Sequence, residues 1–367
     1  MYCEKQLVKI GKRENNKKRN YLVVNRLQGK HIPVIPSQAL SMFKSLAKQI
    51  SDEYKDERLL LIGFAETATA IGATVAIELK SQYIQTTREF IPNVNYIFFS
   101  EEHSHATEQK LVKEDIDKCF SLVDRIIFIE DEVTTGNTIM NIIRKLDSMY
   151  LKKMKYSVAS LLNGMNEKAI NQYSEKKIRT HYLVKTNHDL YDNIANDYLI
   201  DGEYIKCLDS NIIDYKEILV KYWNDCRRTV NAAKYKKSCE QLNEEIIGQI
   251  DFKKIKSVLV LGTEEFMYPA LCLGEDLEKK GLDVKCHATT RSPISVSKNK
   301  NYPVHKRYEL VSLYDSERKT FIYDLNKYDM VIIVTDSQDN IEEGKNSLLR
   351  ALKNSGNNNI VLVRWCK

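Results

Sequence analysis

The stretch 125–138 reads Arg-Ile-Ile-Phe-Ile-Glu-Asp-Glu-Val-Thr-Thr-Gly-Asn-Thr and organises the N-terminal half of the chain. Its apolar run ends abruptly in three acidic residues, 130–132, and a Thr/Gly-rich loop then leads into helical spacing of apolar residues from 139 to 146. The pattern predicts a buried strand, a loop and a helix. Because the backbone N–H groups and hydroxyls of such a loop surround the helix N-terminus, the loop is predicted to bind phosphate.

Carboxylates so close to a phosphate-binding loop restrict the kind of ligand. They would repel a bare nucleoside triphosphate, whereas a sugar phosphate can place its hydroxyls on the acids and its 5′-phosphate in the loop. The stretch has no Gly-Lys-Ser/Thr, which excludes a Walker loop. The alternative is purely structural, namely an acidic strand end that caps the following helix.

The segment resembles the phosphoribosyl pyrophosphate (PRPP) signature of type I phosphoribosyltransferases. Glu130 and Asp131 match the acidic pair, which in that family holds the ribose 2′- and 3′-hydroxyls. Glu132 departs from the family pattern, which usually has an aliphatic residue there, and its side chain is expected to face solvent. The resemblance assigns the 5′-phosphate to the loop residues Thr134, Thr135, Gly136, Asn137 and Thr138.

A second strand-loop-helix pattern precedes this segment. Residues 59–63 form an apolar run, and an Ala-rich helix is predicted over 69–79. Small residues at the turn between them let the backbone approach a ligand closely. In the resembled family the equivalent unit supplies the pyrophosphate-binding loop, a role that falls here on Gly63, Phe64, Ala65, Glu66 and Thr67.

Several basic residues are candidates for the same site. Lys30 follows a glycine turn, where it either lines the site or lies on a surface loop. Residues 100–110 lie where relatives carry a mobile lid, and the resemblance gives Arg88, His103 and His105 the role of neutralising the leaving pyrophosphate. For the two histidines a plain surface loop is the alternative. They do not complete a metal site by themselves, so the expected cofactor is Mg²⁺ bound through PRPP.

The composition limits the class of protein. A chain of 367 residues suggests two or three domains. The net charge of +6, from 56 basic and 50 acidic residues, suits a phosphorylated small molecule and is too small to indicate nucleic acid. The basic stretch 9–19 is interpreted as a solvated extension, with a nucleic-acid arm as the alternative. The eight scattered cysteines lack a Cys-x-x-Cys pair, and no apolar run approaches the roughly 20 residues of a membrane span. We therefore expect a cytoplasmic protein.

The C-terminal part contains three more apolar runs, 258–262, 283–288 and 331–334, each ending in polar residues. Open α/β sheets bind ligands at such strand ends. The tetrad 290–293, Thr-Arg-Ser-Pro, resembles the motif that names the TRSP domain. That domain follows an orotate phosphoribosyltransferase-related domain in proteins associated with tellurite-resistance and stress-response gene clusters. We predict a second, anion-binding site here. The alternative is that the arginine forms a structural ion pair. The residues of the predicted site are Thr263, Glu264, Thr290, Arg291, Ser292 and Asp336.

Together these patterns predict an α/β protein with a type I phosphoribosyltransferase-like parallel sheet in 1–205, a helical connector in 206–250 and a second, smaller, Rossmann-like TRSP domain in 251–367. The predicted activity is transfer of the 5-phosphoribosyl group from PRPP to an unidentified acceptor. By the resemblance, Thr134 stands where purine-salvage relatives can carry an acid next to the base, which favours an orotate-like or unusual acceptor. The alternatives are a non-catalytic PRPP or nucleotide sensor and, on the basic stretch alone, RNA binding. Neither a membrane nor a nucleic acid is expected as a partner, and a homodimer is compatible with the prediction.

Overall fold

The computed structural model describes residues 2–14, 19–99, 109–207, 214–338 and 341–366. Its contacts divide the chain into two compact units that do not follow the predicted limits at 205 and 250. Unit 1 comprises Met1–Glu4, Leu40–Asn187 and Asn224–Lys237. Unit 2 comprises Lys5–Ala39, His188–Trp223 and Ser238–Lys367, so it extends well beyond the predicted TRSP range.

Unit 1 is built on a six-stranded sheet in the order β12-β4-β3-β7-β8-β9. The five strands from β4 to β9 in this order pair in parallel, and the edge strand β12 pairs antiparallel with β4. This confirms the predicted parallel sheet. The strands are β3 (Leu59–Gly63), β4 (Gln82–Gln85), β7 (Arg125–Val133), β8 (Lys155–Asn163), β9 (Arg179–Lys185) and β12 (Val230–Asn231).

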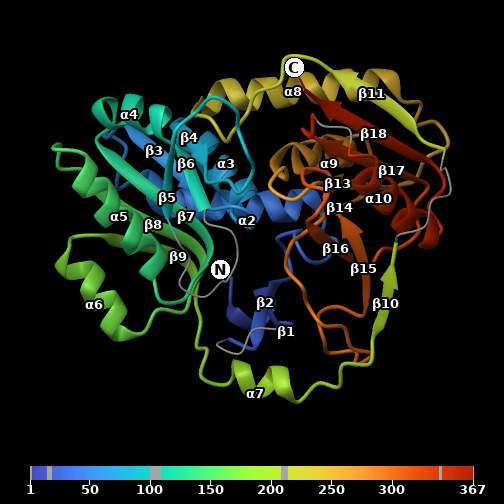
Figure 1. The fold of residues 1–367 in the computed structure, drawn as a ribbon, viewed down its shortest axis with the longest axis horizontal. Helices are drawn as coiled ribbons and strands as arrows, with labels where there is room; N and C mark the ends of the chain where they lie inside the picture. The colour runs from blue at the N-terminus through green and yellow to red at the C-terminus, as the bar shows by residue number, and fades with distance from the viewer. Residues whose placement is uncertain (1, 15–18, 100–108, 208–213, 339–340, 367) are drawn as a thin grey trace. The chain divides into compact units, whose positions relative to one another are not determined.

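Helices connect the parallel strands of unit 1, as the sequence predicts. The crossover from β3 to β4 and the crossover from β7 to β8 run in opposite directions along the sheet, so right-handed connections put their helices on opposite faces (Figure 1). A two-stranded ribbon of β5 (Tyr96–Phe99) and β6 (Gln109–Val112) lies outside the main sheet. The helices are α3 (Thr69–Glu78), α4 (Lys113–Leu122), α5 (Asn137–Met149) and α6 (Glu167–Glu175).

Unit 2 contains a five-stranded, all-parallel sheet in the order β11-β18-β17-β13-β14. A three-stranded sheet, β10-β15-β16, and a hairpin of β1 (Val8–Lys12) and β2 (Tyr21–Asn25) complete its strands. The other strands are β10 (Glu203–Lys206), β11 (Lys216–Val220), β13 (Ser257–Gly262), β14 (Asp283–Ala288), β15 (Lys306–Val311), β16 (Lys319–Tyr323), β17 (Met330–Thr335) and β18 (Ile360–Trp365). The helices are α7 (Tyr191–Asn196), α9 (Tyr268–Lys279), α10 (Glu342–Asn354) and the larger part of α8 (Ala232–Gln249), which belongs to unit 1 as far as Lys237. Along the chain, α1 (Glu4–Leu7) precedes β1, and α2 (Pro36–Ser51) leads from unit 2 into unit 1.

The stretch 206–250, predicted as a helical connector, is helical only in its second half. Helix α8 is present as expected, but β11 and β12 precede it. β11 is an edge strand that pairs only with β18 in the described part of its sheet, and its charged residues Lys216 and Glu217 are exposed. An edge strand of this kind lacks the apolar alternation by which strands are identified in a sequence.

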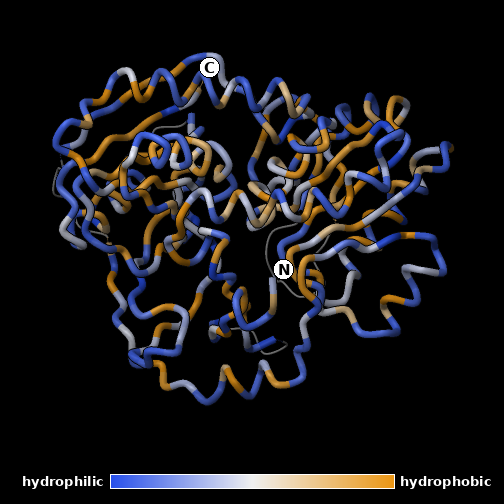
Figure 2. Tube along the Cα trace, turned by 180° about the vertical axis from the view of Figure 1, so that it is seen from behind, coloured by the Kyte–Doolittle hydropathy of each residue, from blue (hydrophilic) through white to orange (hydrophobic). Residues whose placement is uncertain are grey.

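The N-terminal hairpin packs in unit 2 because its apolar side chains complete a core there. Leu22 and Val24 lie in one buried cluster with Ile294, Tyr302 and Tyr323. Backbone pairing reinforces this packing, since short bridges join residues 13 and 34 to residues 294 and 286. Hydrophobic residues concentrate in the strands of both units (Figure 2). Among the described residues, no helix is both long and apolar enough to cross a lipid bilayer.

Candidate functional site

The two loops singled out in the sequence begin at neighbouring strand ends in unit 1. Gly63, the last residue of β3, is in register with Ile129 of β7, and the N–H of Phe64 donates to the carbonyl of Ile129 at 3.0 Å. The loop 63–67 and the acidic end of β7 therefore leave the sheet at the same edge. This is the edge where open α/β sheets bind their ligands.

A side-chain hydrogen bond joins these two loops directly. The Thr67 hydroxyl donates to Oδ1 of Asp131 at 2.7 Å. Desolvation raises the pKa of Asp131 to about 6, and the charge of Glu132 adds to this increase, whereas the bond from Thr67 opposes it. Asp131 keeps part of its surface exposed, so a ligand can reach it. A carboxyl group with a pKa near neutrality in a strand-end site is a candidate functional group.

Glu130 leaves the strand on the other side, because successive side chains of a strand alternate between the two faces. Its charge acts on Tyr173 of α6, whose pKa is raised by burial and, to a smaller extent, by this neighbouring carboxylate. The Tyr173 hydroxyl in turn donates to the carbonyl of Gly136 at 2.6 Å. Glu130 thus lies on the side of the phosphate loop, while Asp131 lies on the side of the loop 63–67.

The Thr/Gly-rich loop ends at the N-terminus of α5, as the sequence predicts. Gly136 precedes α5 with a φ of 74°, and a Cβ atom there would lie 2.7 Å from the Tyr173 hydroxyl oxygen. Only glycine meets both requirements. The N–H of Asn137 donates to the Thr135 hydroxyl at 3.3 Å, which shapes the turn. Thr134 and Thr138 flank this turn, before and inside the first turn of α5.

The end of β4 completes the edge of the sheet. Gln85 is in register with Gly63, and the Thr86 hydroxyl accepts a hydrogen bond from the N–H of Ala65 at 2.8 Å. The same hydroxyl makes a short hydrogen bond to Gln109. Arg88 follows in the chain and is partly buried. The peptide bond between Ala65 and Glu66 is cis, and Glu66 is buried.

Three predicted residues are not part of this description of unit 1. His103, His105 and most of the proposed lid, 100–108, lie outside the described residues. Lys30 belongs to unit 2, where it is fully buried. Its ammonium donates to the backbone carbonyls of Glu264 at 2.5 Å and Thr289 at 3.0 Å.

The predicted second site in unit 2 contains a buried ion-pair network. Glu264 is the second residue after the end of β13, and its carboxylate accepts hydrogen bonds from Nε of Arg291 at 2.7 Å and from Arg318 at 3.0 Å. Arg291 also pairs with Glu265 at 3.2 Å. Ser312 makes a further, short hydrogen bond to Glu264. The alternative interpretation of Arg291, a structural ion-pair partner, agrees with these contacts.

Hydroxyl groups link the other predicted residues of this site. The Thr263 hydroxyl donates to that of Thr335 at 2.8 Å and lies 2.6 Å from the Tyr314 hydroxyl. Tyr314 donates to Asp336 at 2.7 Å, so the ends of β13 and β17 meet as expected. Thr290 and Ser292 occupy the loop after β14, where the Thr290 hydroxyl accepts from the N–H of Ser292 at 3.1 Å.

Sequence reasoning missed the residues that arrive from distant parts of the chain. Thr86 and Tyr173 hold the two loops of unit 1, and neither carries a motif that would mark it. In unit 2 the missed residues are Tyr314 and Arg318. Glu265 could have been predicted as a site residue from the sequence, because it directly follows Glu264 after an apolar strand.

A divalent metal would find oxygen ligands in unit 1 but no complete protein cage. Within the described residues, no group of three or more His, Cys, Asp or Glu side chains is placed to hold a metal ion. Magnesium usually binds through one or two carboxylates together with substrate phosphates. Glu130 and Asp131 fit a metal that arrives with such a substrate.

Comparisons with known proteins agree with this organisation. Residues 7–189 match the family model described as phosphoribosyl transferase, and residues 226–352 match the model described as the TRSP domain C-terminal to it. Solved structures with a similar fold include the Giardia lamblia APRTase (16% identity, 50% of this chain, 95% of that chain, TM-score 0.34). The Aeropyrum pernix orotate phosphoribosyltransferase is another (15% identity, 48% of this chain, 84% of that chain, TM-score 0.31). No curated protein matches the sequence. The two family matches together span most of the chain, which thus belongs to the phosphoribosyltransferases that carry a C-terminal TRSP domain.

Proposed function

We propose that this phosphoribosyltransferase transfers the 5-phosphoribosyl group of PRPP to an acceptor at the strand-end site of unit 1, with Mg²⁺ bound through PRPP. The observation that carries the proposal is the 2.7 Å hydrogen bond between Thr67 and Asp131. It joins a loop suited to pyrophosphate to an acid suited to ribose hydroxyls. A single PRPP molecule needs both groups within one site.

Each part of PRPP has a counterpart in the site. The 5′-phosphate binds the loop 134–138, where the backbone N–H groups at the start of α5 and the helix dipole favour an anion. The ribose hydroxyls donate to Glu130 and Asp131, which leave β7 on its two sides. The pyrophosphate binds the loop 63–67, with Arg88 as a candidate for charge neutralisation.

Binding and orientation supply most of the catalysis. Bond cleavage at C1 gives the ribose oxocarbenium character, and fixed carboxylates stabilise that positive charge where water is excluded. Holding the acceptor and C1 in line removes the entropic cost of their encounter. When bound, Mg²⁺ neutralises pyrophosphate oxygens as a Lewis acid. Ionised Asp131 is needed for these contacts, so binding should weaken as the pH falls below its pKa of about 6.

The test is product formation. The full-length protein is incubated with PRPP, Mg²⁺ and a metabolite extract, and pyrophosphate release and new phosphoribosylated compounds are followed by mass spectrometry. Pyrophosphate release that depends on one fraction of the extract supports transfer. Binding of PRPP without turnover in any fraction would favour a PRPP-sensing regulator instead.

We also propose a second ligand site at the strand ends of unit 2. Its support is the convergence of the β13 and β17 ends through Thr263, Tyr314 and Asp336. Arg291 is already paired with two carboxylates, so its role is to hold the loops in place. A Tyr314→Phe variant should lose any ligand of this site while retaining PRPP binding by unit 1. Unchanged overall product formation in that variant would argue against a second site.

A further inference from the structure

A cavity of about 380 Å³ lies in unit 2 between α8 and the segment that follows β11. Its volume falls within the range of small-molecule sites. The floor is apolar and closed, because Val220, Leu242 and Trp365 are each at most 2% exposed. The indole N–H of Trp365 donates to the carbonyl of Lys221 at 3.2 Å, which fixes both walls at the base of the cavity.

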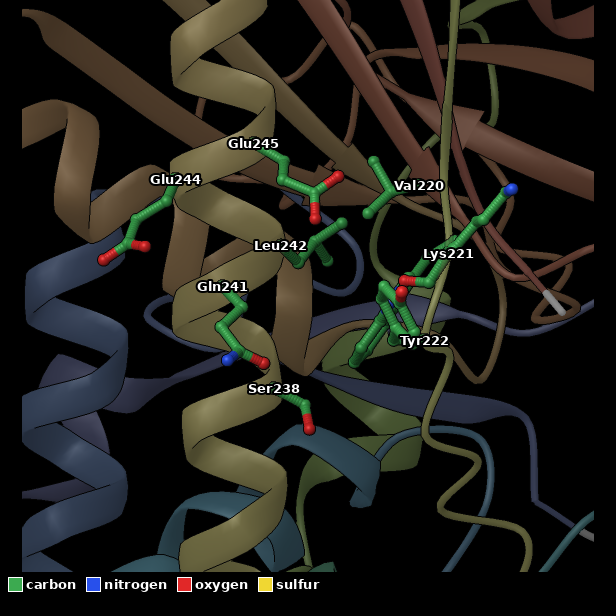
Figure 3. Close-up of a pocket in the computed structure, with 9 residues that line it drawn as sticks. Val220, Lys221, Tyr222, Ser238, Gln241, Leu242, Glu244 and Glu245 are labelled. Atoms are coloured by element: carbon green, nitrogen blue, oxygen red, sulfur yellow. The ribbon is translucent and has the colours of Figure 1, made fainter.

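The rim of the cavity carries an aromatic ring in an unusual backbone position. Tyr222 is 84% exposed, although it has a large apolar surface to bury. Its φ of 64° lies in the left-handed region, which non-glycine residues seldom adopt. Sparsely populated backbone conformations concentrate at ligand sites. Figure 3 shows the ring beside α8, opposite Ser238 and Gln241.

The polar groups of the cavity favour a donor and disfavour an anion. Figure 3 shows the Glu245 carboxylate reaching across the opening toward Val220, while the ammonium of Lys221 points away from α8. Glu244 also lines the cavity, but Figure 3 shows its carboxylate on the side of α8 that faces away from Val220. The Glu245 carboxylate, with no ammonium of the lining residues facing it, disfavours phosphate and accepts hydrogen bonds from amino groups.

We propose that this cavity binds a planar heterocycle that bears amino groups and no phosphate. The ring stacks on Tyr222 above the apolar floor, and the amino group donates to Glu245. Aromatic stacking of this kind holds heterocyclic bases in many proteins. The cavity lies at the carboxyl ends of β11 and β18, and none of the residues of the second site proposed above lines it. It gives unit 2 a means of binding a free base while excluding its nucleotide.

The test uses the full-length protein with adenine and cytosine as amino-bearing probes. Uracil, which lacks the amino group, and AMP, which carries a phosphate, serve as counter-probes. Binding is measured by calorimetry in wild type and in Tyr222→Ala, and the difference between the two is the contribution of the cavity. We expect adenine or cytosine to bind at least about 10-fold more tightly than uracil and AMP, a difference of roughly 1.4 kcal/mol.

Variants decide where the probe binds. Tyr222→Ala and Glu245→Gln should each weaken binding at least about 10-fold. Leu219→Ala changes an exposed residue of β11 that does not line the cavity, and it should leave binding unchanged. A photoreactive azidoadenine should label residues of 220–245. The proposal is overturned if no amino-bearing probe binds, if AMP binds as tightly as adenine, or if Tyr222→Ala and Glu245→Gln retain wild-type affinity.

Discussion

Replacing Asp131 by asparagine is expected to stabilise unit 1 while removing PRPP binding. Asp131 has a folded-state pKa of about 6, and its unfolded value is roughly 3.9. The native state therefore holds this proton more tightly than the unfolded state. Stability is highest below about pH 4, declines as the pH rises through about 4 to 6, and carries the full cost of the ionised group above that range.

The size of the effect follows from the two pKa values. A gap of about two units corresponds to roughly 3 kcal/mol. Because Asp131 is partly exposed, solvent reduces the cost, and we expect Asp131→Asn to gain about 1 to 3 kcal/mol near pH 8 and almost nothing near pH 4. The amide can still accept the hydrogen bond from Thr67, so the loop contact persists.

The measurement must report on unit 1. Both tryptophans, Trp223 and Trp365, lie in unit 2, so hydrogen exchange of the β7 amides is the suitable readout. Glu78→Gln on α3 is the matched control, since this acid is exposed and remote in sequence from the site. Slower exchange in Asp131→Asn near pH 8, with no change in Glu78→Gln, is the predicted result. Equal or faster exchange in Asp131→Asn would refute the reasoning from desolvation.

Three further substitutions test other parts of the account. Gly136→Ala should lower the free energy of unfolding by about 1 to 2 kcal/mol and weaken PRPP binding, because of the positive φ and the clash with Tyr173. Gly248→Ala is the control, and it should be neutral or stabilising because open space surrounds this residue of α8. Equal effects of the two variants would contradict the role assigned to Gly136. Arg291→Met should destabilise unit 2 by up to about 3 to 5 kcal/mol, because the buried carboxylates of Glu264 and Glu265 lose the guanidinium that they share. Arg58→Met breaks an exposed ion pair and should leave hydrogen exchange of unit 1 nearly unchanged. Lys30→Met should cost about 1 to 3 kcal/mol in tryptophan-detected unfolding, because two buried carbonyls lose their donor; a wild-type transition would show that this lysine does not support unit 2.

The sequence was sufficient to predict the central strands of the two parallel sheets and the residues at their carboxyl ends. β3, β7 and β13 are apolar runs with buried residues, each followed by polar residues that mark its carboxyl end. Because a buried parallel strand consists mainly of apolar residues, it can be recognised from a short stretch of sequence alone. The loops of the candidate PRPP site follow from the same local pattern.

Contacts between residues far apart in the chain could not be predicted from the sequence. Lys30 was assigned to the phosphoribosyltransferase site by its place in the chain, yet the hairpin before it completes a core in unit 2 and carries the lysine to the β13 and β14 ends. The support of Gly136 by Tyr173 likewise joins residues 37 positions apart. Nothing local marks either partner, because each contact is decided by tertiary packing.

Calorimetric titration with PRPP in the presence of Mg²⁺ tests the central claim most directly. The comparison is between the wild-type chain and the double variant Glu130→Gln/Asp131→Asn, with hydrogen exchange of β7 as proof that the variant is folded. We predict that the folded double variant binds PRPP at least about 100-fold more weakly, a loss of roughly 2.7 kcal/mol. Unchanged PRPP affinity in the folded double variant would contradict the assignment of this site.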